Sequence, residues 1–386
     1  MTGLLVHEWV AKAGGSENVV EQFVKSFPTA DLQVLWNDDP GRFSATTYET
    51  WIARTPLRRS KMLALPFLPA TWRTLQAHQQ YEWLLTSSHL FAHHVQLRGL
   101  DREVPKFSYV HTPARYIWEP ELDHRGRGPL VRLAAGILKP LDRKRAQESF
   151  RIAANSEFTR KRIERAWGRD SDVIYPPVDT DRIIAGGDWR NHLTSDELDT
   201  LEALPSEFLL GASRFVSYKR LDLVIEAGEA TKLPVVLAGR GPDHDALLAR
   251  AQTAAVPVTF VISPSDEMLY ALYQRALALV FPAIEDFGIM PVEAMAAGTP
   301  VVVPNVGGAL ESVTLAEGGS TIDNPSTQGW REAIETALSI DRSGLPSRTS
   351  QFSTTHFRQL IQTWVLGSQP RGPLANDDHR QGNANV

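Results

Sequence analysis

The stretch FPAIEDFGIMPVEAMAAGTPVVVPNVGG, residues 281 to 308, contains a strand end, a polar loop, a helix and a second strand. Phe281 ends an apolar run that begins at Leu277. Residues 290–297 favour a helix, with Pro291 in its first turn, where the missing N–H costs little. A second apolar run, residues 301–303, follows. Strand, crossover helix and strand in this order predict a parallel α/β unit.

The same alternation of short apolar runs and helix-length segments extends along the whole chain, which is typical of parallel sheets. In the first half, strands are predicted at Leu4 to His7, Leu32 to Trp36, Trp83 to Thr86, Phe107 to Val110 and Arg151 to Ala154. In the second half, they are predicted at Phe208 to Leu210, Val235 to Ala238, Val258 to Ile262, Leu277 to Phe281 and Val301 to Val303. A helix capped by Ser16 is expected between the first two strands.

Two such α/β layers in tandem predict two Rossmann-like domains that face each other across a cleft. The adjacent prolines Pro176 and Pro177 end the first layer, so the boundary is expected between residues 175 and 205. The expected units are residues 1–180, residues 200–345, and a final helix, residues 346–367, that returns toward the first domain. The polar residues 368–386 are expected to be a disordered tail.

Composition excludes several classes of function. The 386 residues carry 40 Lys and Arg against 45 Asp and Glu, so no global positive field favours nucleic acid. The absence of cysteine excludes disulfides, thiolate zinc sites and cysteine nucleophiles. The N-terminus reads as a first strand and not as a secretion signal, and no run approaches the roughly 20 apolar residues of a membrane span. A cytoplasmic protein is expected.

Two cations follow the first strand of the second half. Arg214 and Lys219 lie between that strand and a helical stripe that begins at Leu221. Because ligands bind at the carboxyl ends of parallel strands, these cations are candidates for binding a diphosphate. Each charge-assisted hydrogen bond there would contribute about 1.5 to 3 kcal/mol. An ordinary loop with solvated side chains explains the same two cations equally well.

The opening stretch adds two carboxylates on either side of a helix start. Glu285 is expected in the loop and Glu293 about one turn into the helix, whose first amides are available to an anion or a sugar oxygen. Carboxylates in these positions can accept hydrogen bonds from sugar hydroxyls. Two glutamates at this spacing are common by chance, so the spacing alone is weak evidence.

Taken together, the motifs of the chain resemble the retaining nucleotide-sugar glycosyltransferases of family four, which have the GT-B double-Rossmann fold. The resemblance rests on GGSE, HTPARYIW, AANSEFTRKRI and VIYPPVD in the first half, and on SRFVSYKRLD, AGRGP, VTFVISPSDEMLYALYQRALALVFPAIEDFGIMPVEAMAAGTPVV and NVGG in the second. It extends from Gly14 to Asp323. Within the family, the chain is most similar to bacterial O-antigen and exopolysaccharide mannosyltransferases.

The resemblance implies a role for individual residues of the second half. Arg214 and Lys219 would hold the donor diphosphate and stabilise the charge of the leaving group. Glu293 would bind the nucleotide ribose. Glu285 would hold the hydroxyls of the transferred sugar, together with the backbone amides of residues 287 and 288, Phe287 and Gly288.

In the first half, the resemblance places Gly14 and Gly15 near the phosphates, where a backbone without side chains can approach closely. It places His111 at the reaction centre. A lone histidine after a strand is more often structural, but HTPAR around it favours the active-site interpretation. His111, Glu285, Arg214 and Lys219 are therefore the predicted catalytic residues.

The implied reaction is transfer of a hexose with retention, in which the leaving phosphate oxygen helps to deprotonate an acceptor that attacks on the same face. No protein nucleophile, cofactor or metal is expected, because the two cations do the work of a metal ion. GDP-mannose is the first candidate donor, although Ile262 replaces the glycine of many relatives and leaves the choice between GDP and UDP open. The acceptor would be a glycan, a lipid-linked molecule or a small molecule.

Two other enzyme classes are alternatives to this function, and one basic segment has two interpretations. A nucleotide-sugar epimerase could share the scaffold, whereas a nicotinamide oxidoreductase lacks the required G-x-G-x-x-G near the N-terminus. Residues 125–145 contain seven Arg or Lys and one acidic residue, Asp142, interleaved with leucines. This segment is either a helix that packs on the core with a solvated basic face, or a peripheral contact with an anionic membrane at its inner face.

Overall fold

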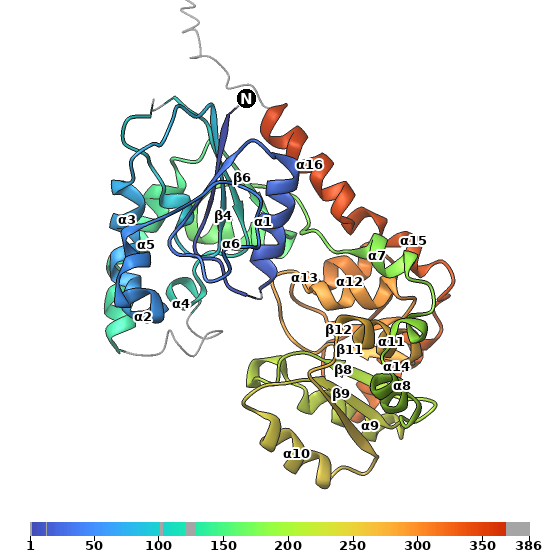
Figure 1. The fold of residues 1–386 in the computed structure, drawn as a ribbon. Coiled ribbons are helices and arrows are strands. Elements are labelled where there is room, and N and C mark those ends of the chain that lie inside the picture. The colour runs from blue at the N-terminus through green and yellow to red at the C-terminus, as the bar shows by residue number, and fades with distance from the viewer. Residues whose placement is uncertain (1, 13, 101–102, 120–128, 368–386) are drawn as a thin grey trace, which may run out of the picture.

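The computed structural model describes residues 2–12, 14–100, 103–119 and 129–367, which form two α/β domains (Figure 1). The first domain is built on a seven-stranded parallel sheet in the order β3-β2-β1-β4-β5-β6-β7. Its strands are β1 Gly3–His7, β2 Asp31–Val34, β3 Thr47–Glu49, β4 Trp83–Ser88, β5 Lys106–Val110, β6 Arg151–Ala154 and β7 Asp172–Val173. Its helices are α1 Gly15–Ser26, η1 Trp51–Arg54, η2 Pro56–Arg59, α2 Lys61–Ala64, η3 Leu65–Phe67, α3 Leu68–Thr74, η4 Ala92–His94, α4 Arg115–Trp118, α5 Pro129–Ala146 and α6 Glu157–Trp167.

The second domain is built on a six-stranded parallel sheet in the order β10-β9-β8-β11-β12-β13. Its strands are β8 Leu209–Ala212, β9 Val235–Gly239, β10 Val258–Ile262, β11 Ala278–Val280, β12 Val301–Pro304 and β13 Gly319–Ile322. The helices from here to the end are α7 Thr180–Ala185, η6 Trp189–His192, α8 Ser195–Glu202, η7 Ser217–Lys219, α9 Asp222–Thr231, α10 His244–Gln252, α11 Asp266–Arg275, α12 Ile289–Ala296, α13 Gly308–Leu315, α14 Thr327–Leu338, α15 Leu345–Arg348, η8 Ser350–Phe352 and α16 Thr354–Leu366.

Both sheets have the doubly wound order in which the chain first moves outward in one direction and then returns to the centre. The reversal falls between β1 and β4 in the first sheet and between β8 and β11 in the second. Parallel sheets of this type bind ligands beyond the carboxyl ends of the strands, at the point of reversal. The loops after β1, β4, β8 and β11 are therefore the expected location of a site.

The last helix leaves the second domain and completes the first (Figure 1). Phe357 of α16 stacks on Phe23 of α1 with ring centroids 5.9 Å apart. Gln362 donates to the carbonyl of Ser26 at 2.8 Å, and the indole of Trp364 donates to Asp172 at 2.8 Å. Residues from the two ends of the described chain thus share one core.

The predicted strands are all present, and β6 and β10 have the predicted bounds. Strands β3, β7 and β13 were not predicted, because they are short and lack a continuous apolar run. The predicted cap of α1 was wrong: the helix begins at Gly15 with Gly14 in the capping position, and the hydroxyl of Ser16 donates to Glu17 at 2.8 Å.

Candidate functional site

A cavity of about 610 Å³ lies between the domains, where the carboxyl ends of both sheets meet. Such a volume is ordinary for a small-molecule site. Of the residues named from the sequence, the cavity is lined by Gly14, Gly15, His111, Lys219, Glu285, Phe287 and Gly288. Arg214 and Glu293 are not among its lining residues. Trp9, Lys61, Met62, Leu65, His89, Leu90 and Arg115 also line it.

Lys219 and Glu285 form the charged part of the second domain's wall. Their side chains are paired at 2.6 Å between Nζ and Oε1. Lys219 ends η7, just beyond β8, and its ammonium lies 5.4 Å over the ring of Phe281 at the end of β11. The Nη2 atom of Arg115 lies 3.9 Å from the other Glu285 oxygen. A phosphate entering here would meet two cations, of which Lys219 is paired with Glu285 and Arg115 mainly with Asp286.

Glycines bring the backbone close together around Glu285. Gly288 caps α12 with φ +87°, a conformation that side chains disfavour. A Cβ on Gly308 would lie 2.0 Å from the carbonyl oxygen of Asp286. In the first domain, a Cβ on Gly14 would lie 2.1 Å from a carboxylate oxygen of Glu17. A side chain at Gly308 would therefore displace the backbone at Asp286, whereas one at Gly14 would displace the carboxylate of Glu17.

His111 follows β5 and is held by a chain of hydrogen bonds inside the first domain. His7 Nδ1 lies 3.2 Å from the carbonyl of Ser87, which can only accept, so that nitrogen carries a proton. The hydroxyl of Ser87 can then donate to Nε2 of His111 at 2.8 Å. Burial, joined by the nearby imidazoles of His89 and His7, lowers the pKa of His111 well below 6.5. His111 is therefore a neutral imidazole that can donate through Nδ1.

A cross-domain contact involves Asp286, the neighbour of Glu285. Its carboxylate accepts from Arg115 at 2.5 Å and also pairs with Arg162, both from the first domain. Burial lowers the pKa of Arg115, but the two carboxylates Asp286 and Glu285 raise it by more, so the net shift is upward. The hydroxyl of Ser156 donates to the backbone carbonyl of Asp286 at 2.5 Å. This contact, which we call the Asp286 clasp, ties the Glu285 loop to the first domain.

A second carboxylate reinforces the clasp from α13. Glu311 accepts from the backbone N–H groups of Glu157 at 2.7 Å and Phe158 at 2.6 Å. These are the first amides of α6, which have no partner within their own helix and carry the positive end of its dipole. Both contacts hold the domains together on the side next to the cavity.

Arg214 lies on the exposed side of the loop after β8, where its guanidinium donates to the hydroxyl of Tyr218 at 2.7 Å. The AGRGP turn packs against this loop. A Cβ on Gly239 would lie 1.9 Å from the carbonyl oxygen of Ser213, and one on Gly241 would lie 2.3 Å from that of Phe215. The turn thus fixes the backbone that carries Arg214, while the role of the Arg214 side chain stays a prediction.

Glu293 occupies the second turn of α12, where the hydroxyl of Tyr273 donates to it at 3.2 Å. Burial raises the pKa of Glu293 to about 7, the bond from Tyr273 opposes this, and the carboxylates of Asp266 and Asp179 raise it further. No cation among the described residues pairs with Glu293. The carboxyl group therefore titrates near neutral pH, and hydrogen-bond donors supplied by a ligand would favour its ionised form.

We expect nucleotide affinity to rise with pH from 6 to 8 if ribose hydroxyls donate to Glu293. The ionised form accepts these bonds best, and the pKa of about 7 leaves it a minority at pH 6. The affinity at pH 6 should be about tenfold below its plateau, since one pH unit below a pKa leaves about a tenth ionised. Calorimetry in buffers of different ionisation enthalpy measures the released proton. Glu293→Gln should remove the pH dependence, and an affinity that falls with rising pH would contradict this role.

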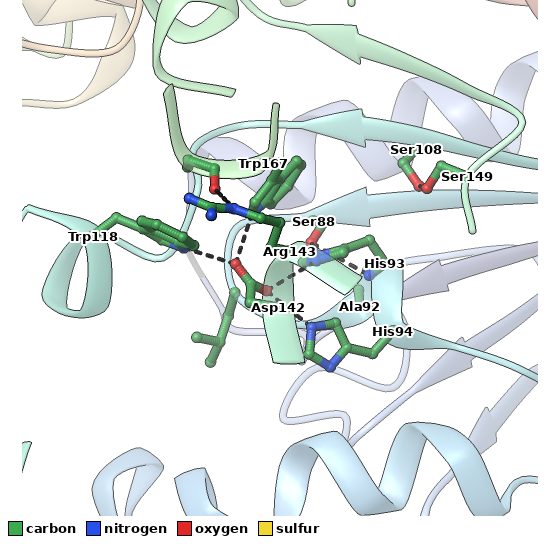
Figure 2. Close-up of polar contacts among 12 residues, drawn as sticks. Ser88, Ala92, His93, His94, Ser108, Trp118, Asp142, Arg143, Ser149 and Trp167 are labelled. Atoms are coloured by element: carbon green, nitrogen blue, oxygen red, sulfur yellow. Dashed lines mark hydrogen bonds and ion pairs between the residues drawn. The ribbon is translucent and has the colours of Figure 1, made fainter. Parts of the chain in front are cut away.

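A buried network behind the cavity centres on Asp142 of α5 (Figure 2). Its Oδ2 accepts from the indoles of Trp118 and Trp167, both at 2.7 Å. Its Oδ1 lies 2.9 Å from His94 Nε2 and 3.0 Å from His93 Nε2. Although burial raises the pKa of Asp142, the two histidines lower it below its usual range. The network joins α5 to α4, α6 and η4.

Asp142 belongs to the basic segment 125–145, so its network shows how the end of that segment is held. Residues 125–128 lie outside the described residues. The end of α5 packs on the domain through Asp142 and Leu138, while Ile137 is 72% exposed. Among the described residues, no helix is long and apolar enough to cross a bilayer.

Two groups of side chains bring potential metal ligands within 4.8 Å of one another, namely His7, Glu8 and His89, and His93, His94 and Asp142. In the second group, the carboxylate already has four nitrogen neighbours. In the first, Oε1 of Glu8 accepts from three backbone amides. Hydrogen bonds within the protein engage both oxygens of Asp142 but only Oε1 of Glu8, whose Oε2 has no hydrogen-bond partner among the described residues.

Several residues of the site were not named from the sequence, chiefly Glu8, His89, Asp286, Arg162, Ser156 and Glu311. Glu8 and His89 directly follow the apolar strands β1 and β4, a position where an ionisable residue signals a site. The partners of the Asp286 clasp come from loops and helices more than 120 residues apart in the chain, so no local pattern announces them.

Comparisons with known proteins bear on the family and the fold of the chain. Residues 13–182 match the family model described as Glycosyltransferase Family 4, and residues 199–353 match Glycosyl transferases group 1. The chain is 24% identical to alpha-1,3/1,6-mannosyltransferase alg-2 of Neurospora crassa over 58% of its own length and 57% of that protein. It is 30% identical to D-inositol 3-phosphate glycosyltransferase of Mycolicibacterium smegmatis over 55% of its length and 50% of the relative. The alignments thus span about half the length of these curated relatives.

Solved structures share the fold along nearly the whole chain. The Anabaena protein HepE in complex with UDP matches 94% of this chain and 98% of its own, with a TM-score of 0.64 and 17% identity. Sucrose-phosphate synthase of Thermosynechococcus elongatus matches the same shares, with a TM-score of 0.68 and 15% identity. The fold is GT-B. The chain belongs to the group 1 glycosyltransferases of family 4.

Proposed function

We propose that the protein is a retaining glycosyltransferase that transfers a hexose from a nucleoside diphosphate sugar to an acceptor bound in the cavity. One observation carries the proposal: the cavity between the two sheets brings Lys219 and Glu285 of one domain together with His111 and the Gly14 loop of the other. Cations for a diphosphate and a carboxylate for sugar hydroxyls are what this reaction requires.

In the proposed reaction, the acceptor oxygen bonds to the anomeric carbon while the bond from that carbon to the diphosphate breaks. The leaving diphosphate takes the electron pair, and one of its oxygens takes the hydroxyl proton. Lys219 and Arg214 stabilise the growing negative charge. Glu285 and the amides of residues 287 and 288 orient the sugar, and neutral His111 donates a hydrogen bond to it. No step requires a protein nucleophile or a metal ion.

Mannose from GDP-mannose is the first candidate donor, supported by the similarity to a mannosyltransferase of Neurospora crassa. UDP sugars are the second candidate donors, because HepE was solved with UDP. Ile262, at the expected edge of the base site, is half exposed at the end of β10, where its side chain can contact either base.

A lipid-linked acceptor is favoured over a free glycan by the mouth of the cavity. Met62 lines the cavity yet is 52% exposed, and Leu63 and Phe67 beside it are also exposed. The exposed cation Lys61 lies at the same edge. Apolar side chains beside cations suit the interface of an anionic membrane. A bacterial polysaccharide precursor would be one acceptor of this chemistry.

The test has two stages. A thermal-shift screen with GDP, UDP and their hexose derivatives should show selective stabilisation, about 2.7 kcal/mol at 100 times the dissociation constant. The stabilising sugar nucleotide is then offered with free hexoses, octyl α-D-mannoside, or a polyprenyl-diphosphate glycan in vesicles, and the anomeric configuration of the product is determined by NMR. Conversion of the donor alone into another hexose would identify an epimerase. Failure to bind or consume any of these donors would refute the proposal.

A further inference from the structure

Glu8 is a fully buried carboxylate directly after β1, in contact with His89, which lines the cavity. Its Oε1 accepts from the backbone amides of His89 at 3.2 Å, Leu90 at 2.9 Å and Ala92 at 3.0 Å, and from the hydroxyl of Ser88 at 3.4 Å. Burying a charge is costly unless hydrogen bonds compensate it. In Glu8 all of these hydrogen bonds go to Oε1, so Oε2 is available to another partner.

The other oxygen, Oε2, faces the ring of His89. It lies 3.2 Å from His89 Nδ1, and neither buried atom has a hydrogen-bond partner among the described residues. At this distance the negative charge of Glu8 favours the tautomer with its proton on Nδ1 electrostatically, although the pair lacks hydrogen-bond geometry. His89 lines the cavity with 23% of its side chain exposed. Because Nδ1 is buried, the exposed part of the ring is the opposite edge, which carries Nε2.

Surrounding contacts fix the ring of His89. Trp9 meets it edge-on with ring centroids 4.9 Å apart. The turn that follows is held by the Asp142 network shown in Figure 2, since Asp142 contacts His93 and Ser88 lies 2.9 Å from His93 Nδ1. A solvated surface histidine does not need to be held this rigidly. Ordering the ring costs conformational entropy, and a functional role for His89 would explain that cost.

His89 belongs to the first domain's wall of the cavity, together with Trp9, Leu65 and the donor-side residues Gly14 and His111. The proposed donor ligands Lys219 and Glu285 belong to the second domain, whereas His89, Trp9 and Leu65 belong to the first. The exposed apolar residues of the cavity mouth, Met62 among them, are on this same side. A molecule entering from the mouth reaches His89 along the first domain's wall.

We propose that His89 binds the attacking hydroxyl of the acceptor through Nε2, and that Glu8 is a positioning residue that holds the proton on Nδ1. The inference rests on the proposed function and assigns the acceptor subsite to it. In the transfer step, Nε2 accepts a hydrogen bond from the acceptor hydroxyl as it approaches the anomeric carbon. The hydroxyl proton ends on the departing diphosphate, so His89 is unchanged after each turnover.

Glu8→Gln is the sharpest test, because the three backbone amides require an oxygen where Oε1 now lies. The new amide nitrogen then replaces Oε2 and donates to Nδ1, which drives the His89 proton to Nε2. A carboxylate with a purely structural role would lose little in this isosteric change. We expect kcat/KM for octyl α-D-mannoside to fall about 10- to 100-fold in Glu8→Gln and at least as much in His89→Ala, as when a wrong tautomer or a lost hydrogen bond disables a site.

Three measurements separate this role from a general defect. Donor affinity and the slow hydrolysis of the donor by water, measured without acceptor, should stay within about twofold of the wild type, because neither uses the acceptor subsite. His89→Gln, whose amide oxygen can accept from a hydroxyl, should recover part of the loss. Asp31→Asn is the matched control: this buried carboxylate of β2 is held by Gln79 and Tyr81, outside the cavity lining, and should leave transfer unchanged.

Equal losses of donor hydrolysis and transfer in Glu8→Gln, or unchanged acceptor kinetics in His89→Ala, would overturn the inference while the proposed function stands. A divalent metal ion that binds the wild type and is lost in His89→Ala would also overturn it, because His7, Glu8 and His89 would then hold that ion. A wild-type protein that neither binds nor consumes a sugar nucleotide would overturn the proposed function and this inference together.

Discussion

Replacing Lys219 with alanine is expected to lower kcat for hexose transfer by about 100- to 1000-fold, the usual cost of removing one donor from a charge-stabilising site. Lys219 Nζ lies 2.6 Å from Glu285 at the carboxyl ends of the central strands β8 and β11. Negative charge grows on the diphosphate as it leaves, so the ammonium stabilises the transition state more than the bound donor. Steady-state kinetics with saturating donor measures the loss.

Two companion variants sharpen this prediction. Lys219→Arg keeps the charge but changes its shape, so recovery should be partial. Arg250→Ala removes a cation of the same domain that is paired with Glu229 on the surface, and should leave kcat unchanged. Arg214→Ala should cause a loss comparable to that of Lys219→Ala only if its guanidinium turns from Tyr218 toward the bound donor. An unchanged kcat in Lys219→Ala would contradict the proposed mechanism.

Glu285→Ala and Glu293→Ala are expected to fail in different ways. Glu285→Ala should abolish transfer while the affinity for the nucleoside diphosphate is largely kept, because Glu285 would contact only the sugar. Its removal also frees Lys219 for the phosphates. Glu293→Ala should weaken nucleotide binding about 10- to 100-fold, the equivalent of one charge-assisted hydrogen bond of about 1.5 to 3 kcal/mol.

Calorimetric titration with the nucleoside diphosphate, paired with transfer kinetics, distinguishes the two effects. Glutamine substitutions serve as controls of shape, since they keep the volume of each side chain and remove the charge. Thermal unfolding of each variant shows whether the fold is intact, which matters for Glu285 because it is tied to Lys219 and Arg115. Equal loss of nucleotide binding in both alanine variants would contradict the assigned roles.

The sequence predicted the central strands well because they carry continuous apolar runs. Strands β6 and β10 have the predicted bounds, and α12 begins within one residue of the prediction. The edge strands β3 and β7 span three and two residues, and β13 has the sequence Gly-Ser-Thr-Ile with a single apolar side chain, so hydrophobic periodicity could not reveal them. The start of α1 differed because Gly14 takes the capping position while Ser16 bonds to Glu17.

Part of the cavity lining was predicted from the sequence, while the roles of its residues stay predictions. Motifs located Gly14, His111, Lys219 and Glu285, and these four line one cavity. The sequence did not indicate that Lys219 and Glu285 would pair, because 66 residues separate them. It also gave no reason to single out His89, whose significance depends on a buried carboxylate 81 positions earlier.

The order of apolar runs, loops and helix signals by itself determined two parallel α/β layers, because backbone pairing and burial follow from local periodicity. It also placed cations and carboxylates after strands, where ligands bind. Only the tertiary structure decided which charges meet: the Lys219 and Glu285 pair, the Asp286 clasp, and the contact of Glu8 with His89. Coulomb attraction and desolvation act over a few ångströms in space, and distance along the chain carries no information about them.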